Sequence, residues 1–311
     1  MPEFQKRVSI LMGTRDGGEF LSEQLKSIEG QDYPHWSLTV SDDGSTDETI
    51  AILNEFREGR PDKLVKMIKG PGRGFSRNFL NLALQDETGA AYFAWADQDD
   101  VWLPFKLSHV LKLIAPYGED LPVLYCGRTK LIDENGAPAG FSPLRSAPPP
   151  LFSNAIVQSI AGGNTMVFNR EARRLIVKGC RFDLPSHDWW AYQVISGAGG
   201  LVVYDSTVTV EYRQHGLNLV GSNRGLPAFL GRVKKAWLKN FRSMNDRNFR
   251  ALSGVKDDLS RGGREILDSV VNLRSEFDLL NIRRQIKKHR IFRRSAAQQA
   301  ALYLGFRLRR V

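Results

Sequence analysis

The sequence predicts an α/β fold, in which a mostly parallel sheet is flanked by helices, followed by a basic, helical C-terminal region. Over about the first two-thirds of the 311 residues, short apolar, β-rich segments alternate with amphipathic segments of helical period. This alternation is typical of right-handed βαβ units. From residue 225 onward, aromatic and aliphatic residues recur among many Lys and Arg without strand-like segments. We therefore predict one domain at residues 1–223 and a mostly helical region at residues 224–311.

The elements of the first half follow in a regular order. Apolar, β-rich runs predict strands at residues 8–12, 36–40, 63–68 and 91–96, with a fifth strand from residue 123. Apolar residues at helical spacing predict helices between these strands, the last of them from about residue 105 to 114. Ser45 and Glu48 have the spacing of a capping box, which predicts that the second helix begins there.

The second half begins with residues 134–150, ENGAPAGFSPLRSAPPP. Their Pro, Gly and Ala content predicts a loop or hinge and no strand. Farther along, the segment 170–179 has a helical pattern, and residues 201–205 and 207–213 predict two short strands.

The overall composition is that of a folded, water-soluble protein. Hydrophobic residues make up 42% of the chain and charged residues 25%, and no apolar run approaches the roughly 20 residues of a membrane-spanning helix. The first residues, MPEFQKRVSI, lack the apolar core of a signal peptide. Cys126 and Cys180 have no metal-site spacing, which favours thiols in a reducing compartment. We therefore expect a cytoplasmic protein.

The positive charge is concentrated at the C-terminal end. Residues 224–311 contain 22 Lys and Arg against 7 Asp and Glu, a net charge of +15, whereas the remainder carries 22 against 27, a net charge of −5. Such an asymmetry indicates a polyanionic partner. No nucleic-acid-binding module is recognisable. We therefore expect no nucleic acid and favour an anionic membrane surface, with the protein peripheral on the inner face of the cytoplasmic membrane.

One segment has the pattern of an interfacial amphipathic helix. Basic residues surround an apolar face that consists of Leu226, Phe229, Leu230, Val233, Trp237 and Phe241. The alternative is a helix that packs on the main domain and exposes a solvated basic face.

Three polar clusters follow predicted strands: GTRDGG at 13–18, SDDGSTD at 41–47 and ADQDD at 96–100. In an open parallel sheet, ligands bind at the carboxyl ends of the strands, so we expect these clusters to form one site. Asp97 and Asp99 could bind one hard cation, Mg2+ or Mn2+, because Mg2+ typically takes one or two carboxylates together with water and substrate phosphate. The alternatives are helix capping for Asp42 and Asp43 and a solvated loop for the third cluster.

A further cluster and two missing motifs narrow the chemistry. The glycine-rich GPGRGFSRN, residues 70–78, is either a plain turn or a close approach to a ligand with Arg73 or Arg77 near phosphate. No Gly-x-x-x-x-Gly-Lys-Ser/Thr motif is present, which argues against a P-loop phosphotransferase. No Gly-x-Gly-x-x-Gly follows the first strand, which argues against a dinucleotide enzyme.

Five segments together resemble the inverting family 2 glycosyltransferases with the nucleotide-sugar-binding GT-A fold. In family order, they are VSILMGTRDGGEFLSEQLKSI, LTVSDDGSTDET, FAWADQDDVWLPFKL, GGNTMVFNR and SHDWWAYQV with YRQHGLN. The last two resemble the rhamnosyltransferase-like branch, which builds bacterial surface polysaccharides such as lipopolysaccharide. One departure is TRDG, with Arg15 and Asp16, where the family usually has Thr-Tyr-Asn-Gly.

The resemblance implies a role for each matching residue. In the nucleotide pocket, it implies a wall at Thr14, a bond to the base from Asp43 and support from Asp42. For the metal and diphosphate, it implies the pair Asp97 and Asp99, with Asp99 the direct ligand, and His215. Asp188 matches the catalytic base. The alternatives are a helix N-cap for Asp188 and a structural role for His215. Trp102, Trp189 and Trp190 could stack on the sugar or the acceptor, with core packing as an equal alternative.

These roles predict a metal-dependent, inverting glycosyltransferase. The donor is a nucleoside diphosphate sugar, linked to UDP or dTDP, and the acceptor a glycan or a lipid-linked glycan. One alternative is a sugar-nucleotide nucleotidyltransferase, of which GTRDGG would be a poor phosphate loop. The other is a non-catalytic sugar-nucleotide-binding protein, against which the combination of Asp43, Asp97, Asp99 and Asp188 argues.

Overall fold

The computed structural model describes residues 6–60, 65–85, 89–145, 148–160, 162–216, 227–309 and 311, with only the helical backbone for 227–240. The strands are β1 (Val8–Thr14), β2 (Trp36–Asp42), β3 (Val65–Lys69), β4 (Tyr92–Ala96), β5 (Val101–Trp102), β6 (Val123–Asp133), β7 (Pro138–Phe141), β8 (Val167–Asn169) and β9 (Leu201–Gln214). The helices are α1 (Gly18–Glu29), α2 (Thr49–Glu58), α3 (Phe75–Leu84), α4 (Lys106–Ile114), α5 (Phe152–Ala155), α6 (Arg170–Ile176), α7 (His187–Gly197), α8 (Pro227–Gly254), α9 (Arg261–Leu273), α10 (Leu279–Lys288) and α11 (Ala296–Arg307).

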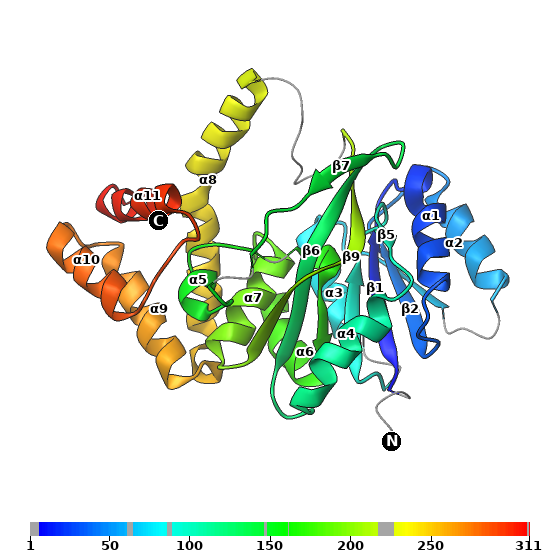
Figure 1. The fold of residues 1–311 in the computed structure, drawn as a ribbon, viewed down its shortest axis with the longest axis horizontal. Helices are drawn as coiled ribbons and strands as arrows, with labels where there is room; N and C mark the ends of the chain where they lie inside the picture. Colours follow the sequence, from blue (N-terminus) through cyan, green and yellow to red (C-terminus); the bar gives the residue numbers. More distant parts are fainter. Residues whose placement is uncertain are drawn as a thin grey trace.

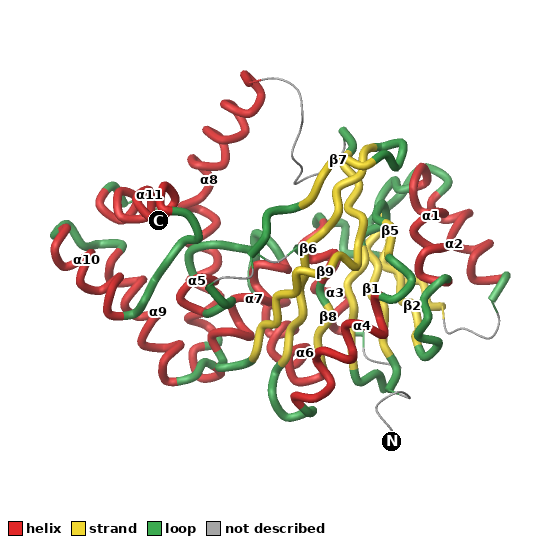
Figure 2. The backbone as a smooth tube through the Cα atoms, viewed as in Figure 1, coloured by secondary structure: helices red, strands yellow, loops and turns green. Residues whose placement is uncertain are grey.

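The described strands form one sheet in the order β3-β2-β1-β4-β8-β6-β9-β5, with β7 beside β6 (Figures 1 and 2). Strands β1 to β4 pair in parallel, as predicted. Farther along, β8 is antiparallel to β4 and β6, and β5 is antiparallel to β9. The α/β fold is therefore confirmed, with a parallel half that carries the predicted polar clusters and a mixed half beside it.

Helices cover both faces of the sheet. In β1, Ile10 and Met12 belong to the core cluster that includes residues of α1, α2 and α4, whereas Leu11 points into the cluster that includes residues of α3, α6 and α7. Side chains alternate between the faces of a strand, so a strand buried on both sides is apolar throughout. This burial explains why four of the five residues of VSILM are hydrophobic, Ser9 being the exception.

The predicted loop at 134–150 contains a strand, so that prediction was wrong. Strand β7 pairs antiparallel with β6 at the margin of the sheet. Gly136, whose φ of 81° only glycine adopts readily, closes the turn by donating its N–H to Asp133 O over 3.0 Å. Pro138 is the first residue of β7, a position at which proline is tolerated in a strand.

Two other boundaries differ from the predictions. The segments 201–205 and 207–213 form one strand, β9, whose pairing with β6 is irregular between Gly127 and Thr129. The prediction of a capping box at Ser45 and Glu48 was also wrong. Helix α2 begins at Thr49, Glu48 occupies the N-cap position, and no side chain caps the helix. The Ser45 hydroxyl instead donates to the Asp42 carboxylate.

The C-terminal helices lie on the opposite side of the molecule from α1 and α2 (Figure 1). Most of their buried apolar residues belong to the same core cluster as those of α3, α6 and α7. Helix α9 meets the end of α7 closely, since Ser260 N–H donates to Gly197 O over 3.0 Å and a Cβ on Gly263 would lie 2.2 Å from that oxygen. The division at residue 223 stays a proposal.

Most of the predicted amphipathic stripe, Leu226 to Trp237, lies outside the described side chains. Phe241 is described; it is buried against the protein, with its ring stacked 6.2 Å from that of Trp189. Among the described residues, no helix has the length and hydropathy of a membrane span.

Candidate active site

The structure brings together the polar clusters that the sequence places after β1, β2 and β4. Thr14 Oγ1 donates to Asp42 Oδ1 over 2.9 Å, which joins the first cluster to the second. Arg15 N–H donates to Gln98 Oε1 over 2.8 Å, and Gln98 Nε2 donates back to Arg15 O over 3.0 Å. This reciprocal pair joins the first cluster to the third, so the carboxyl ends of three parallel strands form one edge.

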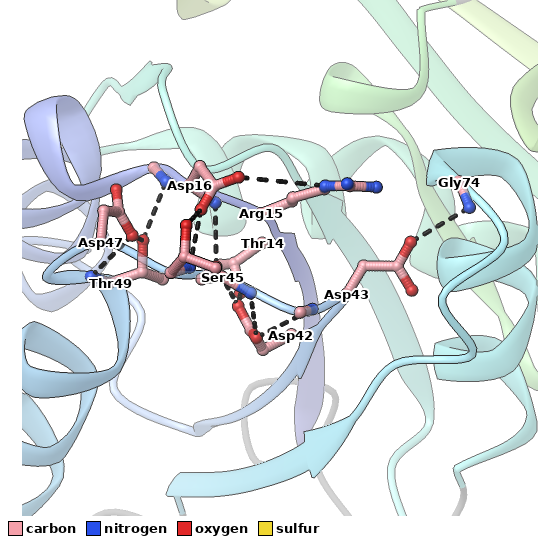
Figure 3. Close-up of polar contacts among 12 residues, drawn as sticks. Thr14, Arg15, Asp16, Asp42, Asp43, Ser45, Asp47, Thr49 and Gly74 are labelled. Atoms are coloured by element: carbon pink, nitrogen blue, oxygen red, sulfur yellow. Dashed lines mark hydrogen bonds and ion pairs between the residues drawn. The ribbon is translucent and has the colours of Figure 1, made fainter.

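Asp42 organises the loop after β2. Its Oδ2 accepts the N–H groups of Gly44 and Ser45 over 3.1 and 2.9 Å, while its Oδ1 accepts the Thr14 and Ser45 hydroxyls. Figure 3 shows Asp42 among these partners, whereas Asp43 points away toward Gly74. The Asp42 carboxylate thus stabilises the turn and supports the wall at Thr14.

Asp43 holds the glycine-rich turn before α3. Its carboxylate accepts the N–H groups of Gly72 over 2.6 Å and Gly74 over 3.1 Å. Gly70 donates to Asp42 O, and a Cβ on Gly70 would lie 2.7 Å from Asp43 Oδ1. Residues 70–74 therefore approach the site closely, and Asp43, 7% exposed, lies between that turn and β1.

The third cluster is crowded with negative charge. Burial raises the pKa of Asp97 to about 7, with further contributions from the neighbouring charges of Asp99 and Asp188 and an opposing one from Lys106. Asp99 Oδ2 lies 2.7 Å from His215 Nε2. The structure therefore brings all four acidic and imidazole residues of the predicted metal and base sites, namely Asp97, Asp99, Asp188 and His215, to one edge of the sheet.

Two buried cations that the sequence analysis missed lie beneath this cluster. Lys106 Nζ donates to Asn164 O over 2.9 Å and lies 3.5 Å from the centre of a Trp102 ring. Burial holds the pKa of Lys106 well below its usual value, while Asp100 and Asp97 oppose that shift. Because its charge acts on Asp97 and Asp100, Lys106 is an internal counter-charge to these two aspartates.

Arg213 is the second buried cation. Its Nε donates to Asp99 O over 3.0 Å, its backbone N–H donates to Asp100 Oδ1 over 3.2 Å, and its guanidinium pairs with Glu23. Asp100 also accepts a bond from Asn164 Nδ2 over 2.7 Å. Burial, followed by the charges of Asp99 and Asp97, raises the pKa of Asp100 well above its usual value. Arg213 and Asn164 thus fix the backbone that presents Asp99.

Asp188 lies in the first turn of α7, near enough to the third cluster for its charge to raise the pKa of Asp97, after burial and Asp99. Its Oδ1 accepts the Ser186 hydroxyl and the N–H of Trp189, the latter over 2.6 Å. Beside it, the His187 ring stacks on Phe79 at 4.3 Å. Burial lowers the pKa of His187 to about 4, against an opposing contribution from Asp188, so the imidazole is neutral at pH 7.

The structure places the remaining predicted residues as follows. Arg73 and Arg77 line a cavity of about 240 Å³ beside residues 182–184, and the Arg77 guanidinium donates to Cys180 O. Trp102, Trp189 and Trp190 are at most 3% exposed. Their burial fits core packing, the alternative that the sequence left open, and gives no exposed ring face for a sugar.

The donor set fits a hard divalent cation. Carboxylates and imidazoles are ligands that such a cation accepts, and Asp99 Oδ2 lies 2.7 Å from His215 Nε2. Burial, followed by the charges of Asp99 and Asp188, raises the pKa of Asp97, and a dication nearby would favour the charged carboxylate. Within the described residues, no three such side chains form a complete metal site. Mg2+ commonly takes one or two carboxylates and completes its coordination with water and substrate phosphate.

The parallel strands β1 to β4 and the acidic cluster at their carboxyl ends are the arrangement expected of a nucleotide-sugar-binding glycosyltransferase fold. The chain belongs to Glycosyl transferase family 2, whose model matches residues 9–170. It is 28% identical over 248 residues to the dTDP-rhamnosyl transferase RfbG of Shigella flexneri. The aligned residues cover 73% of this chain and 81% of that protein.

Solved structures agree on the fold. TarS of S. aureus with UDP-GlcNAc matches with a TM-score of 0.57 and 16% identity, over 84% of this chain and 70% of that one. The mannosyltransferase PcManGT of Pyrobaculum calidifontis, in complex with GDP-Man and Mn2+, matches with a TM-score of 0.51 and 18% identity, over 98% and 87%. The GT-A prediction is therefore confirmed.

Proposed function

We propose that this glycosyltransferase is metal-dependent and inverting. Its donor would be a dTDP- or UDP-linked sugar, with rhamnose favoured by the name of the Shigella flexneri relative. Its acceptor would be a glycan or a lipid-linked glycan in the synthesis of a bacterial surface polysaccharide. We place the enzyme in the cytoplasm, at the inner face of the membrane. The observation that carries the proposal is the convergence of Asp97, Asp99 and Asp188 at one edge.

Asp188 is the proposed general base. Within the part of the chain that the structure describes, both hydrogen bonds of the Asp188 carboxylate fall on Oδ1, so we assign Oδ2 to the proton of the acceptor hydroxyl. A base that activates the acceptor opposite the leaving diphosphate gives inversion at the anomeric carbon, as in inverting glycoside hydrolysis. The fixed Ser186 and Trp189 contacts hold the carboxylate in the orientation needed for that proton transfer.

Asp99 and Asp97 are the proposed metal ligands, assisted by His215. A bound divalent cation supplies Lewis-acid stabilisation of the negative charge on the leaving diphosphate. Thr14, Asp42 and Asp43 are proposed to line the nucleotide pocket. Asp43 already accepts two backbone N–H groups, and its remaining lone pairs are available for an N–H of the base. Arg73 and Arg77 are proposed to lie near phosphate.

Calorimetric titration of the protein with UDP and with dTDP, with and without Mn2+, tests the metal proposal. We expect nucleotide binding to strengthen with Mn2+ in wild type and to lose that dependence in Asp99→Ala. Asp120→Asn, an exposed carboxylate outside the site, is the matched control. Equal affinity with and without metal would refute the metal-dependent mechanism, and transfer from labelled dTDP-rhamnose then decides the donor separately.

A further inference from the structure

A group of exposed apolar side chains lies on the C-terminal helices, far from the acidic edge in sequence. It consists of Phe277, Leu279, Leu280, Leu304 and Leu308, which are between 53% and 75% exposed. We call these five residues the apolar patch. Surface leucines that occur singly are ordinary, but five within 32 residues of sequence require an explanation.

The structure assembles the patch from two helices. Leu279 and Leu280 begin α10, and Phe277 lies two residues before it. Leu304 lies in the last turn of α11, and Leu308 follows that helix directly. The Arg309 guanidinium lies 3.9 Å from the centre of the Phe277 ring, which brings the two ends together. Figure 1 shows α10 and α11 beside each other at the margin of the molecule.

The patch is not part of the face that these helices bury. Helix α10 packs through Ile282 and Ile286, and α11 through Leu302 and Phe306, all at most 2% exposed. Each helix therefore carries apolar residues on an inner face and again on its outer surface. The residues of the apolar patch therefore do not contribute to the buried core.

The surroundings of the patch are strongly basic. Residues 277–311 contain ten Lys and Arg against one Asp, a net charge of +9. Seven of these cations are exposed, namely Arg283, Arg284, Lys287, Lys288, Arg290, Arg307 and Arg309. The surface therefore combines apolar side chains with a high density of positive charge.

We propose that this surface docks on an anionic lipid bilayer, with the apolar patch inserted at the headgroup level and the basic residues against acidic lipids. Interfacial binding needs buried apolar area and attraction to anionic headgroups, and the surface supplies both from described side chains. The negative charge of the acidic lipids is complementary to the positive charge of this surface. The inference rests on the membrane location proposed above and names the surface that produces it, separate from the stripe around Leu226.

Co-sedimentation of the full-length protein with vesicles tests the proposal at low salt. We expect wild type to bind vesicles that contain equal amounts of phosphatidylglycerol and phosphatidylcholine, and to bind pure phosphatidylcholine much more weakly. Leu280→Ser combined with Leu308→Ser should weaken binding at least about 10-fold, because two apolar side chains no longer leave water. Leu144→Ser, equally exposed but outside the patch, should bind like wild type.

A second pair of variants tests the charge. The first triple variant combines Arg283→Gln, Arg284→Gln and Lys287→Gln. It should bind the vesicles about 100-fold more weakly, since each cation near an anionic surface contributes about 1 kcal/mol. Lys26→Gln, Arg57→Gln and Lys112→Gln remove the same charge from exposed positions on α1, α2 and α4 and should weaken binding far less. Equal losses in the two triple variants would show that only bulk charge matters and would overturn the proposal.

Two further outcomes would also overturn it. Wild type that stays in the supernatant refutes membrane docking. A dimer detected by light scattering and dissociated by the double leucine variant would make the patch an interface between two copies of this chain. Metal-dependent hydrolysis of the sugar nucleotide in solution should be unchanged in every variant. Its absence from wild type would contradict the transferase proposal and leave the docking result intact.

Discussion

The two acidic loops of the site have similar compositions and opposite environments. After β2, Asp42 and Asp43 accept backbone N–H groups from Gly44, Ser45, Gly72 and Gly74. After β4, Asp97 has a pKa raised to about 7 by burial and by its acidic neighbours. Protein hydrogen bonds therefore stabilise the first pair, whereas the second cluster concentrates negative charge beside two buried cations.

This difference separates carboxylates that hold the backbone around a pocket from carboxylates that are suited to bind a metal or to act as a base. A carboxylate that accepts several N–H groups fixes the backbone around it. Carboxylates that crowd one another are costly unless a cation is near, which makes such a cluster a candidate for metal binding and catalysis. Acidic residues alone do not distinguish the two cases; their hydrogen-bond partners do.

The substitution with the largest expected effect is at Asp188, whose charge acts on Asp97 in the crowded cluster. Asp188→Asn should lower the rate of sugar transfer about 10²- to 10⁴-fold, the usual contribution of a general base. Because Asn keeps the shape and can still accept a bond from Ser186, nucleotide affinity should stay close to that of wild type. Steady-state kinetics and calorimetry on the same preparation check both. A rate within a few-fold of wild type would place the base elsewhere.

Removal of the counter-charge beneath the cluster should destabilise the fold. Lys106→Met should lower the free energy of unfolding by about 3–5 kcal/mol near pH 7, because it leaves buried carboxylates without their cation. Raised carboxyl pKa values mean that the folded state retains protons which the unfolded chain releases above about pH 4. The variant should therefore regain stability as the pH falls below 7.

Urea unfolding at several pH values measures this effect. Lys112→Met, an exposed position on the same helix, is the control and should change stability little. A Lys106 variant as stable as wild type at pH 7 would show that the aspartates do not need an internal cation.

His187 gives a pH effect of opposite sign. Its pKa of about 4 in the folded protein lies below its ordinary 6.5, so the unfolded chain binds a proton between those values that the folded protein does not. Stability from this group is present above pH 6.5 and is lost as the pH falls toward 4, by up to about 3 kcal/mol. His187→Leu should therefore gain stability relative to wild type on acidification. Parallel pH profiles for the two proteins would contradict the expectation.

The smallest effect is expected in the hydrogen-bonded loop. Asp42→Ala should lower the free energy of unfolding by about 1–2 kcal/mol, because water can replace part of its hydrogen bonds at this partly exposed site. Binding of Mn2+ in the absence of nucleotide should not change. Thermal unfolding and a metal titration test this contrast. A loss of metal affinity as large as that of Asp99→Ala would remove the distinction between the two loops.

The parallel half of the fold could be predicted because β1, β2 and β4 are buried on both faces and its helices are amphipathic. The mixed half was harder to predict. Strand β7 contains Pro138 and Gly140, which ordinarily indicate a turn, and only its position at the sheet margin permits them. Ser45 matched a capping box, but Asp42, three residues earlier, takes its hydroxyl in the structure.

Within the site, the clustering of the acidic residues followed from the strand ends, but the buried Lys106 and Arg213 were missed. A Lys or Arg in sequence usually indicates a solvated surface. For Lys106 one signal was available: with Val110 and Ile114 it shares the buried face of α4, so a charge stood at an apolar position. Arg213 had no such signal, because its partners on other elements come together only in the fold.

The close contact between Gly197 and Gly263 also bears on how this chain could have evolved. At that point α9 touches the end of α7, the helix that carries Asp188, and a Cβ on Gly263 would have no room. A recombination event that supplied a different C-terminal region would have to reproduce a glycine at this contact and an apolar face for the shared core. The sequence of the C-terminal helices is therefore constrained by the helix that carries the proposed base, however freely their outer surface changes.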